Sequence, residues 1–248
     1  MRIVAAIVAL VLVSLGAFPA SALAGEAVDA IVVLAADVSR SINEDEFTLQ
    51  RRGYAAAIVS PKLMEAIQGG PHGAIALCYV EWAAEGEQKI VVDWKIVRGS
   101  SDAEAFAATL LAAPRAFVGR TAIGSAIDFA MTAIGASGFS SDRKVIDVSG
   151  DGTSNQGRAA PEARDAAVEA GAIINGLAIF NRSAAAQSGY LALHTNPPGG
   201  LAQYYRDNVI GGPGAFVLPI DDFGKFSEAM IRKLIAEIAS GAAPPEGG

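Results

Sequence analysis

The sequence has 248 residues, with 26 acidic against 19 basic side chains and a formal net charge of −7. This negative balance argues against nucleic acid and anionic lipid surfaces as partners, because both repel an acidic protein. The single cysteine, Cys78, excludes an intrachain disulfide, so packing must stabilise the fold. Cys78 lies in an apolar run, which predicts a buried side chain rather than a reactive thiol.

Residues 1–24 have the pattern of a secretory signal peptide. Arg2 precedes a long apolar stretch that ends in the small-residue exit Ala22-Leu23-Ala24. We expect the mature chain to begin near Gly25 and to be periplasmic or secreted, with no membrane insertion after cleavage. A retained membrane anchor is the alternative, because the apolar run approaches the length of a spanning helix. Glu26 follows where a lipoprotein would need its cysteine.

The rest of the chain predicts one α/β domain over residues 25–240, followed by a disordered Pro- and Gly-rich tail over 241–248. Near-continuous apolar runs alternate with amphipathic stretches, which is typical of a mostly parallel sheet covered by helices on both faces. The expected strands are 30–36, 73–80, 89–97, 145–149, 173–180 and 215–220. The second and third are joined by a short turn, which predicts one antiparallel edge strand.

Helix starts between these strands carry recognisable signals. Asn43 with Glu46 forms a capping-box pattern, and Ser101 with Glu104 predicts a second such cap. Thr121 is expected to open a further helix, and Pro161 suits the first turn of the next one. Two more helices are expected, one containing Tyr204 and Tyr205 and one over residues 222–239.

Polar side chains follow the expected strands where each strand ends. Asp37-x-Ser39-x-Ser41 follows the first strand, Asp151 follows the strand 145–149, and Thr121 precedes a helix. Ligands of open α/β sheets bind at the carboxyl ends of the strands, so these side chains are expected to meet. If residues 37–41 are extended, alternation directs positions 37, 39 and 41 to one side.

This donor set suits a hard divalent cation. Carboxylate and hydroxyl oxygens favour Mg²⁺ or Mn²⁺ over zinc, and Ca²⁺ stays possible. Two carboxylates and three neutral hydroxyls leave residual positive charge on the metal. The predicted site would therefore attract an acidic group from outside, and Arg40, Arg120 and Gly152 are expected to lie near enough to contact it.

These motifs, in this order, resemble the metal-ion-dependent adhesion site (MIDAS) of von Willebrand factor A (vWA) domains. The resemblance implies a Rossmann-like vWA fold. It also implies that Ser39, Ser41 and Thr121 bind the metal directly, that Asp37 and Asp151 act mostly through waters, and that a partner's carboxylate completes the octahedron. Longer strings, among them GRTAIGSAI and VIDVSGDG, resemble an exported bacterial vWA-like domain-of-unknown-function family. Arg40 departs from the wider pattern, in which glycine is frequent.

The remaining polar residues are interpreted as structural. Asp147 lies in an apolar strand and needs a basic partner, such as Arg143. His72 and His194 lie in Gly- and Pro-rich loops and are expected at the surface. Trp82 is expected to pack in the core.

The leading hypothesis is a non-enzymatic, exported module that binds an acidic group of a protein or other ligand through the metal. No nucleophile and base pattern is recognisable. Three alternatives stay open at this stage. They are a metal-dependent phosphoester hydrolase assisted by Asp147 or Glu81, a carrier of small acidic solutes, and a structural protein with an inactive site.

Overall fold

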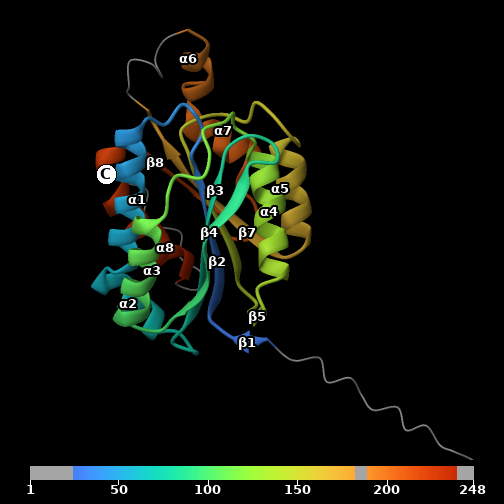
Figure 1. Ribbon diagram of the computed structural model, residues 1–248. Coiled ribbons are helices and arrows are strands. Elements are labelled where there is room, and N and C mark those ends of the chain that lie inside the picture. Colours follow the sequence, from blue (N-terminus) through green and yellow to red (C-terminus); the bar gives the residue numbers. More distant parts are fainter. Residues whose placement is uncertain (1–24, 182–188, 239–248) are drawn as a thin grey trace, which may run out of the picture.

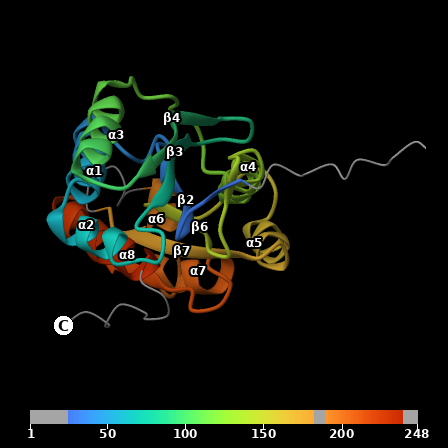
Figure 2. The ribbon, with the colours of Figure 1, turned by 90° about the horizontal axis from the view of Figure 1, so that it is seen from below.

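The computed structural model describes residues 25–181 and 189–238 as three layers, with a central sheet between two layers of helices (Figures 1 and 2). The predicted signal peptide and the tail 241–248 lie outside the described residues. The sheet has six strands in the order β4-β3-β2-β6-β7-β8. These strands are β2 (Ala30–Asp37), β3 (Ile75–Trp82), β4 (Gln88–Val97), β6 (Lys144–Gly150), β7 (Ala172–Ile179) and β8 (Val217–Ile220).

The pairing confirms the predicted topology. Only β3 and β4 pair antiparallel in this sheet, and the other neighbours are parallel. Every residue of β2 and β3 is buried, whereas in the edge strand β4 only Val92 and Val97 are buried and the other positions are half-buried or exposed. Two short strands, β1 (Glu26–Ala27) and β5 (Phe139–Ser140), form a separate parallel pair below the sheet in Figure 1. The sequence did not predict this pair.

Helices cover both faces of the sheet, as Figure 2 shows. One layer contains α1 (Glu44–Ile58), α2 (Pro61–Gln68), α3 (Ser100–Ala112) and α8 (Phe226–Ile238), and the other contains α4 (Ile123–Gly135), α5 (Ala160–Glu169) and α7 (Leu201–Asn208). A short 3₁₀ turn (Phe223–Lys225) precedes α8. The small helix α6 (Gly189–Thr195) lies beyond the carboxyl ends of the strands, at the top of Figure 1.

Alternating residues of β2 divide the core into two halves. Val32 and Leu34 face the first helical layer, where Tyr54 packs edge-on against Phe226 with ring centroids 4.9 Å apart. Ile31 and Val33 face the second layer, among the aliphatic residues of α4. Because both faces are covered, the strands are apolar at nearly every position.

Two predicted core residues are buried as expected. Cys78 and Trp82, both on β3, are fully buried. Burial in apolar surroundings raises the pKa of the Cys78 thiol to about 12, so the thiolate is strongly disfavoured. Cys78 is therefore an inert packing residue.

The helix starts are partly as predicted. The capping box of Asn43 and Glu46 is present, and Pro161 lies in the first turn of α5. The predicted cap at Ser101 is wrong, because α3 begins at Ser100 without a side-chain cap. The backbone N–H of Arg98 instead donates to the carboxylate of Asp102.

Thr121 lies two residues before α4 rather than opening it. Two helices, α2 and α6, were not predicted at all. None of the helices in residues 25–181 and 189–238 is both long and apolar enough to cross a bilayer.

Candidate metal centre

The end of β2 forms a turn that gathers three of the predicted ligands. The backbone N–H of Ser39 donates to Asp37 Oδ1 at 2.7 Å, and the N–H of Ile42 donates to the Ser39 carbonyl at 3.0 Å. Residues 39–42 are thus turned and not extended, which corrects the alternation argument. The turn nevertheless places the hydroxyl oxygens of Ser39 and Ser41 3.1 Å apart.

Asp151, at the end of β6, reaches the same point. Its Oδ1 accepts a hydrogen bond from Ser41 Oγ at 2.6 Å, and its Oδ2 accepts one from Asn181 Nδ2 at 2.7 Å. Because β2 and β6 are parallel neighbours, their carboxyl ends coincide. Asp37, Ser39, Ser41 and Asp151 are all buried.

Thr121 arrives at this edge through the loop that leads into α4. Its backbone N–H donates to Asn155 Oδ1 at 3.1 Å, and its carbonyl accepts from the Asn155 N–H at 2.8 Å. Thr121, Ser41 and His194 line one small cavity of about 10 Å³, roughly the space of one water molecule. The structure therefore brings the three sequence segments together.

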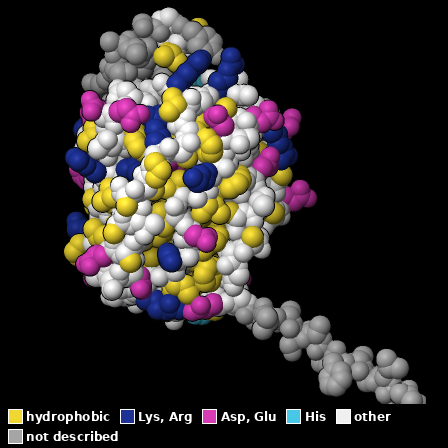
Figure 3. Space-filling view, viewed as in Figure 1, with side chains coloured by type: hydrophobic (Ala, Val, Ile, Leu, Met, Phe, Trp, Pro, Cys, Tyr) yellow, Lys and Arg dark blue, Asp and Glu magenta, His cyan; other side chains and the backbone are white. Residues whose placement is uncertain are grey.

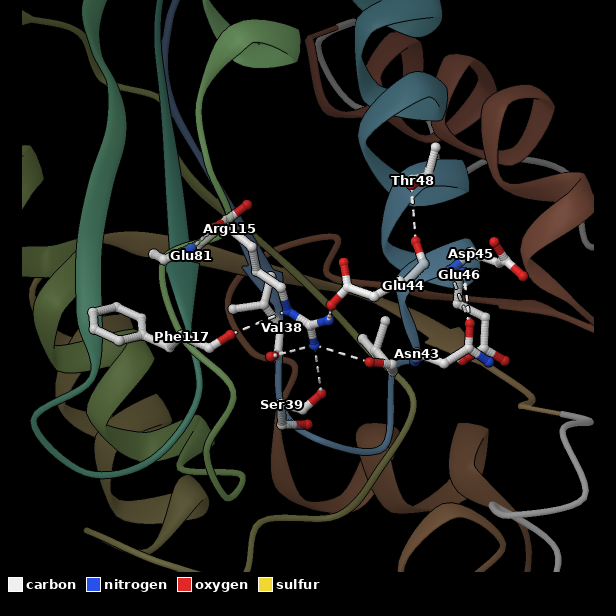
Figure 4. Close-up of polar contacts among 12 residues, drawn as sticks. Val38, Ser39, Asn43, Glu44, Asp45, Glu46, Thr48, Glu81, Arg115 and Phe117 are labelled. Carbon is white, nitrogen blue, oxygen red and sulfur yellow. Dashed lines mark hydrogen bonds and ion pairs between the residues drawn. The ribbon is translucent and has the colours of Figure 1, made fainter.

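Arg115 fixes the backbone of the turn, as Figure 4 shows. Its Nη2 donates to the carbonyls of Val38 and Ile42, each at 2.9 Å, and to that of Ser39 at 3.1 Å. Its Nη1 pairs with Glu44 at 2.8 Å. The guanidinium thus holds the carbonyls of the turn rather than the buried carboxylates. Sequence reasoning missed Arg115, because no local motif marks a residue that acts on a turn 76 positions away.

Within residues 25–181 and 189–238, no basic side chain forms an ion pair with Asp37 or Asp151, although Arg115 is near enough to lower the pKa of Asp37. Burial, followed by the nearby Asp151, raises the pKa of Asp37 to about 8, and burial raises that of Asp151 to about 6. Asp37 Oδ2 is buried and has no hydrogen-bond partner within the described part of the chain. A Cβ on Gly150 would come within 2.6 Å of Tyr205 Oη and 2.9 Å of this oxygen, so glycine is required where the two side chains approach the backbone.

These observations fit a bound divalent cation. An unpaired buried carboxylate is costly, and a cation would relieve that cost. Residues 25–181 and 189–238 contain no group of three or more His, Cys, Asp or Glu side chains suited to a metal, so a metal here would depend on hydroxyl ligands. Asp37, Asp151, Ser39, Ser41 and Thr121 are the residues that would hold it.

Two of the three residues expected to contact a ligand lie at the opening, and the third, Gly152, does not line it. Arg40 and Arg120 are exposed and line the small cavity. Gly152 is buried beneath the ring of His194, and a Cβ there would lie 2.2 Å from His194 Nε2. Glycine at this position therefore admits the imidazole.

The prediction of a surface His194 is wrong. His194 is buried, with its Nε2 3.2 Å from Thr121 Oγ1, whereas His72 is exposed as predicted. The loop composition around His194 masked a short helix that turns the ring inwards. The sequence marked this region only by the Gly- and Pro-rich stretch 196–200 that follows it.

Asp147 and Glu81 have structural partners. Asp147 pairs with Lys233 of α8 at 2.8 Å and not with Arg143, whose Nε donates to the carbonyl of Glu237. Glu81 pairs with Arg51 of α1 at 2.6 Å. Sequence reasoning found the need for a base near Asp147 but missed both partners, which lie on distant helices.

A family model described as "Protein of unknown function (DUF1194)" matches residues 27–242. The chain belongs to this family. No curated protein matches the DUF1194 sequence.

Solved structures show the fold of the DUF1194 chain to be that of vWA domains. A von Willebrand factor type A protein from Catenulispora acidiphila is 12% identical, with a TM-score of 0.56, over 85% of this chain and 43% of the other. Proximal thread matrix protein 1 from the mussel byssus is 14% identical, with a TM-score of 0.61, over 86% and 49%. Another structure of that mussel protein, described as having a zinc-occupied MIDAS motif, is 16% identical, with a TM-score of 0.58, over 86% and 49%. The chain spans about half the length of the mussel protein, and at these identities the likeness concerns the fold alone.

Proposed function

We propose that this chain is a binding module in which a divalent cation, held by Asp37, Ser39, Ser41, Thr121 and Asp151, captures an acidic group of a protein or other ligand. The observation that carries the proposal is the buried, unpartnered Asp37 Oδ2 beside two serine hydroxyls and a second buried carboxyl group. A buried polar atom without a partner calls for an explanation, and a bound cation is the one that the neighbouring hydroxyl and carboxyl oxygens support. The zinc-occupied MIDAS described for the mussel protein, which has a similar fold, supports the proposal of a divalent cation at this site.

Mg²⁺ is the proposed ion, with Mn²⁺ or Ca²⁺ as the alternatives, because hydroxyl oxygens and few carboxylates suit hard cations. When bound, the ion supplies residual positive charge that attracts a carboxylate. Arg40 and Arg120 lie exposed at the opening and add positive charge there. The proposed partner is a protein or small acidic ligand that supplies this carboxylate, and the predicted signal peptide supports a periplasmic or secreted setting.

The face of the molecule seen in Figure 3 has no large patch of one charge that would attract a charged ligand. Acidic and basic side chains lie interspersed over the face seen in Figure 3. Charge recognition is therefore proposed to come from the metal and the two arginines.

Hydrolysis at the same ion is the less favoured function. The two groups expected to assist it, Asp147 and Glu81, are fully buried and paired with Lys233 and Arg51. Neither lines the small cavity at Ser41 and Thr121.

The test is a thermal-melt titration of the protein with Mg²⁺, Mn²⁺ and Ca²⁺. An ion that binds only the folded state raises Tm in proportion to its binding free energy. We expect the shift in the wild type and its loss in Ser39→Ala and Asp151→Ala, with Ser100→Ala on α3 as the matched control. If none of the three ions changes Tm, or if Ser39→Ala responds like the wild type, the proposal is wrong.

A further inference from the structure

The imidazole of His194 lies at the edge of the proposed metal site and has no role in the proposed function so far. Helix α6 brings it over the carboxyl ends of the strands, where Nε2 is 3.2 Å from Thr121 Oγ1. The same ring lines the small cavity with Ser41 and Thr121. A buried imidazole beside a proposed ligand is itself a potential ligand.

The spacing fits two donors of one metal ion. Neighbouring ligands of an octahedral ion with bonds of about 2.1 Å lie roughly 3 Å apart. His194 Nε2 and Thr121 Oγ1 are 3.2 Å apart, and Ser39 Oγ and Ser41 Oγ are 3.1 Å apart. Both pairs therefore have the separation of adjacent ligands, and Ser41, Thr121 and His194 line the same small cavity.

One tautomer of the ring can donate the lone pair of Nε2 to the site. On its other side, Nδ1 lies 3.2 Å from Thr153 Oγ1, an oxygen able to accept the Nδ1 proton. With the proton on Nδ1, the lone pair of Nε2 points to Thr121. Metal-binding histidines are usually oriented by such an outer hydrogen bond.

The backbone fixes the position of α6 against the site. The N–H of Thr153 donates to the carbonyl of His194 at 3.0 Å. Gly152 lies directly beneath the ring, with no room for a Cβ. Gly152 and Thr153 therefore fix the position of the imidazole.

We propose that His194 is an internal nitrogen ligand of this metal site, adjacent to Thr121, and that it shifts the preference of the site from Mg²⁺ towards Zn²⁺. This inference rests on the proposed metal site and adds a ligand to it. Nitrogen donors favour Zn²⁺, whereas Mg²⁺ prefers oxygen alone.

The experiment measures the affinities of the full chain for Zn²⁺ and Mg²⁺ alone by titration calorimetry. For His194→Ala we expect at least about a tenfold loss of Zn²⁺ affinity and less than about a threefold change for Mg²⁺. His72→Ala, at the exposed histidine, is the matched control and should bind both ions like the wild type.

Two further measurements separate ligation from a structural role. Gly152→Ala should displace the ring and lower Zn²⁺ affinity while His194 is still present. In the ¹⁵N-labelled wild type, Zn²⁺ should shift the Nε2 resonance of His194, as expected for direct coordination.

If His194→Ala binds Zn²⁺ as tightly as the wild type while Ser39→Ala does not, His194 is no ligand and the proposed function stands. A Zn²⁺ titration that leaves the His194 ring resonances unchanged would also exclude His194 as a ligand. If the wild type binds neither these two ions nor Mn²⁺ or Ca²⁺, the metal site and the histidine ligand are both wrong.

Discussion

Two groups of buried carboxyl groups lie at β6: an internal group, Asp147 and Glu237, and an upper group, Asp151 and Asp37. They differ in whether a lysine or arginine side chain of the described residues forms an ion pair with them. Within the strand, Asp147 pairs with Lys233 at 2.8 Å, and Glu237 shares the same ammonium group. At the end of the strand, Asp151 and Asp37 have hydroxyl and amide neighbours, while Arg115 directs its donors to carbonyls and Glu44.

The difference teaches how this chain uses burial. The internal group is neutralised by α8, which ties the helix to the sheet. The upper group forms no ion pair with the described residues, and Ser41, which donates to Asp151, lines the small cavity. A buried carboxylate with a resident cation is structural, whereas one without it is the better candidate for binding.

The largest effect is expected when the ammonium group of Lys233 is removed from the internal group. Lys233→Met leaves Asp147 and Glu237 buried without positive charge, so the free energy of unfolding should fall by about 3–5 kcal/mol in urea denaturation. Lys225→Met is the control, because its pair with Asp221 is exposed and contributes about 0–1 kcal/mol. Equal losses in the two variants would contradict the distinction.

Neutralising Asp37 of the upper group should leave the free energy of unfolding of the metal-free protein undiminished. In metal-free buffer, Asp37→Asn should not reduce the free energy of unfolding, because the amide removes a buried group that lacks its cation. The variant should, however, lose the metal-induced gain, which for the wild type is about 2.7 kcal/mol at a hundredfold excess over Kd. Urea denaturation with and without Mg²⁺ measures both.

Asp45→Asn, an exposed carboxylate on α1, is the control and should keep the metal response. A strongly destabilised Asp37→Asn in metal-free buffer would show that the chain already compensates this carboxylate.

The pH dependence of stability should distinguish Glu237 from an ordinary carboxylate. Burial and Asp147 raise its pKa from 4.5 to about 7. The folded state thus binds the proton more tightly than the unfolded state. Its contribution to stability is complete below pH 4.5 and is lost as the pH rises through 7. As the pH rises between these values, the free energy of unfolding of Glu237→Gln should fall less than that of the wild type in urea denaturation. An equal fall in the two proteins would refute the raised pKa.

The smallest effect concerns the anchoring of the upper group. Asn43 accepts hydrogen bonds from the N–H groups of Asp45 and Glu46, each at 3.0 Å. Asn43→Ala should cost about 1 kcal/mol in thermal unfolding. The Mg²⁺ response should be unchanged, and a lost response would show that the cap also positions the site.

Much of the fold follows from the sequence because its strands are buried on both faces. The apolar runs predicted six strands and the single antiparallel pair, and Asn43 with Glu46 marked the start of α1. The short helix α2 was missed although Ser60 caps it and Pro61 follows, because its eight residues fell in a presumed connection. Short elements carry too few periods for a pattern to show.

The convergence of the predicted side chains at one edge could be predicted, but the residues that surround them could not. Asp37, Ser39, Ser41 and Asp151 met as expected because parallel strands end at one edge. The partners set by tertiary packing were missed, and these are Lys233, Arg51, Arg115 and His194. Each contacts a residue at least 30 positions away in the chain. A local motif carries no information about such pairs.

Cys78 turns the core into a built-in reporter of unfolding. Its thiol is buried on β3, next to the edge strand β4, and is the chain's single cysteine. Thiol-reactive dyes should not react with the native protein. They should modify only molecules in which unfolding exposes the Cys78 thiol. The modification rate would then report the population of the open state. A cysteine introduced at an exposed residue such as Val118 could be labelled selectively in the otherwise unaltered protein.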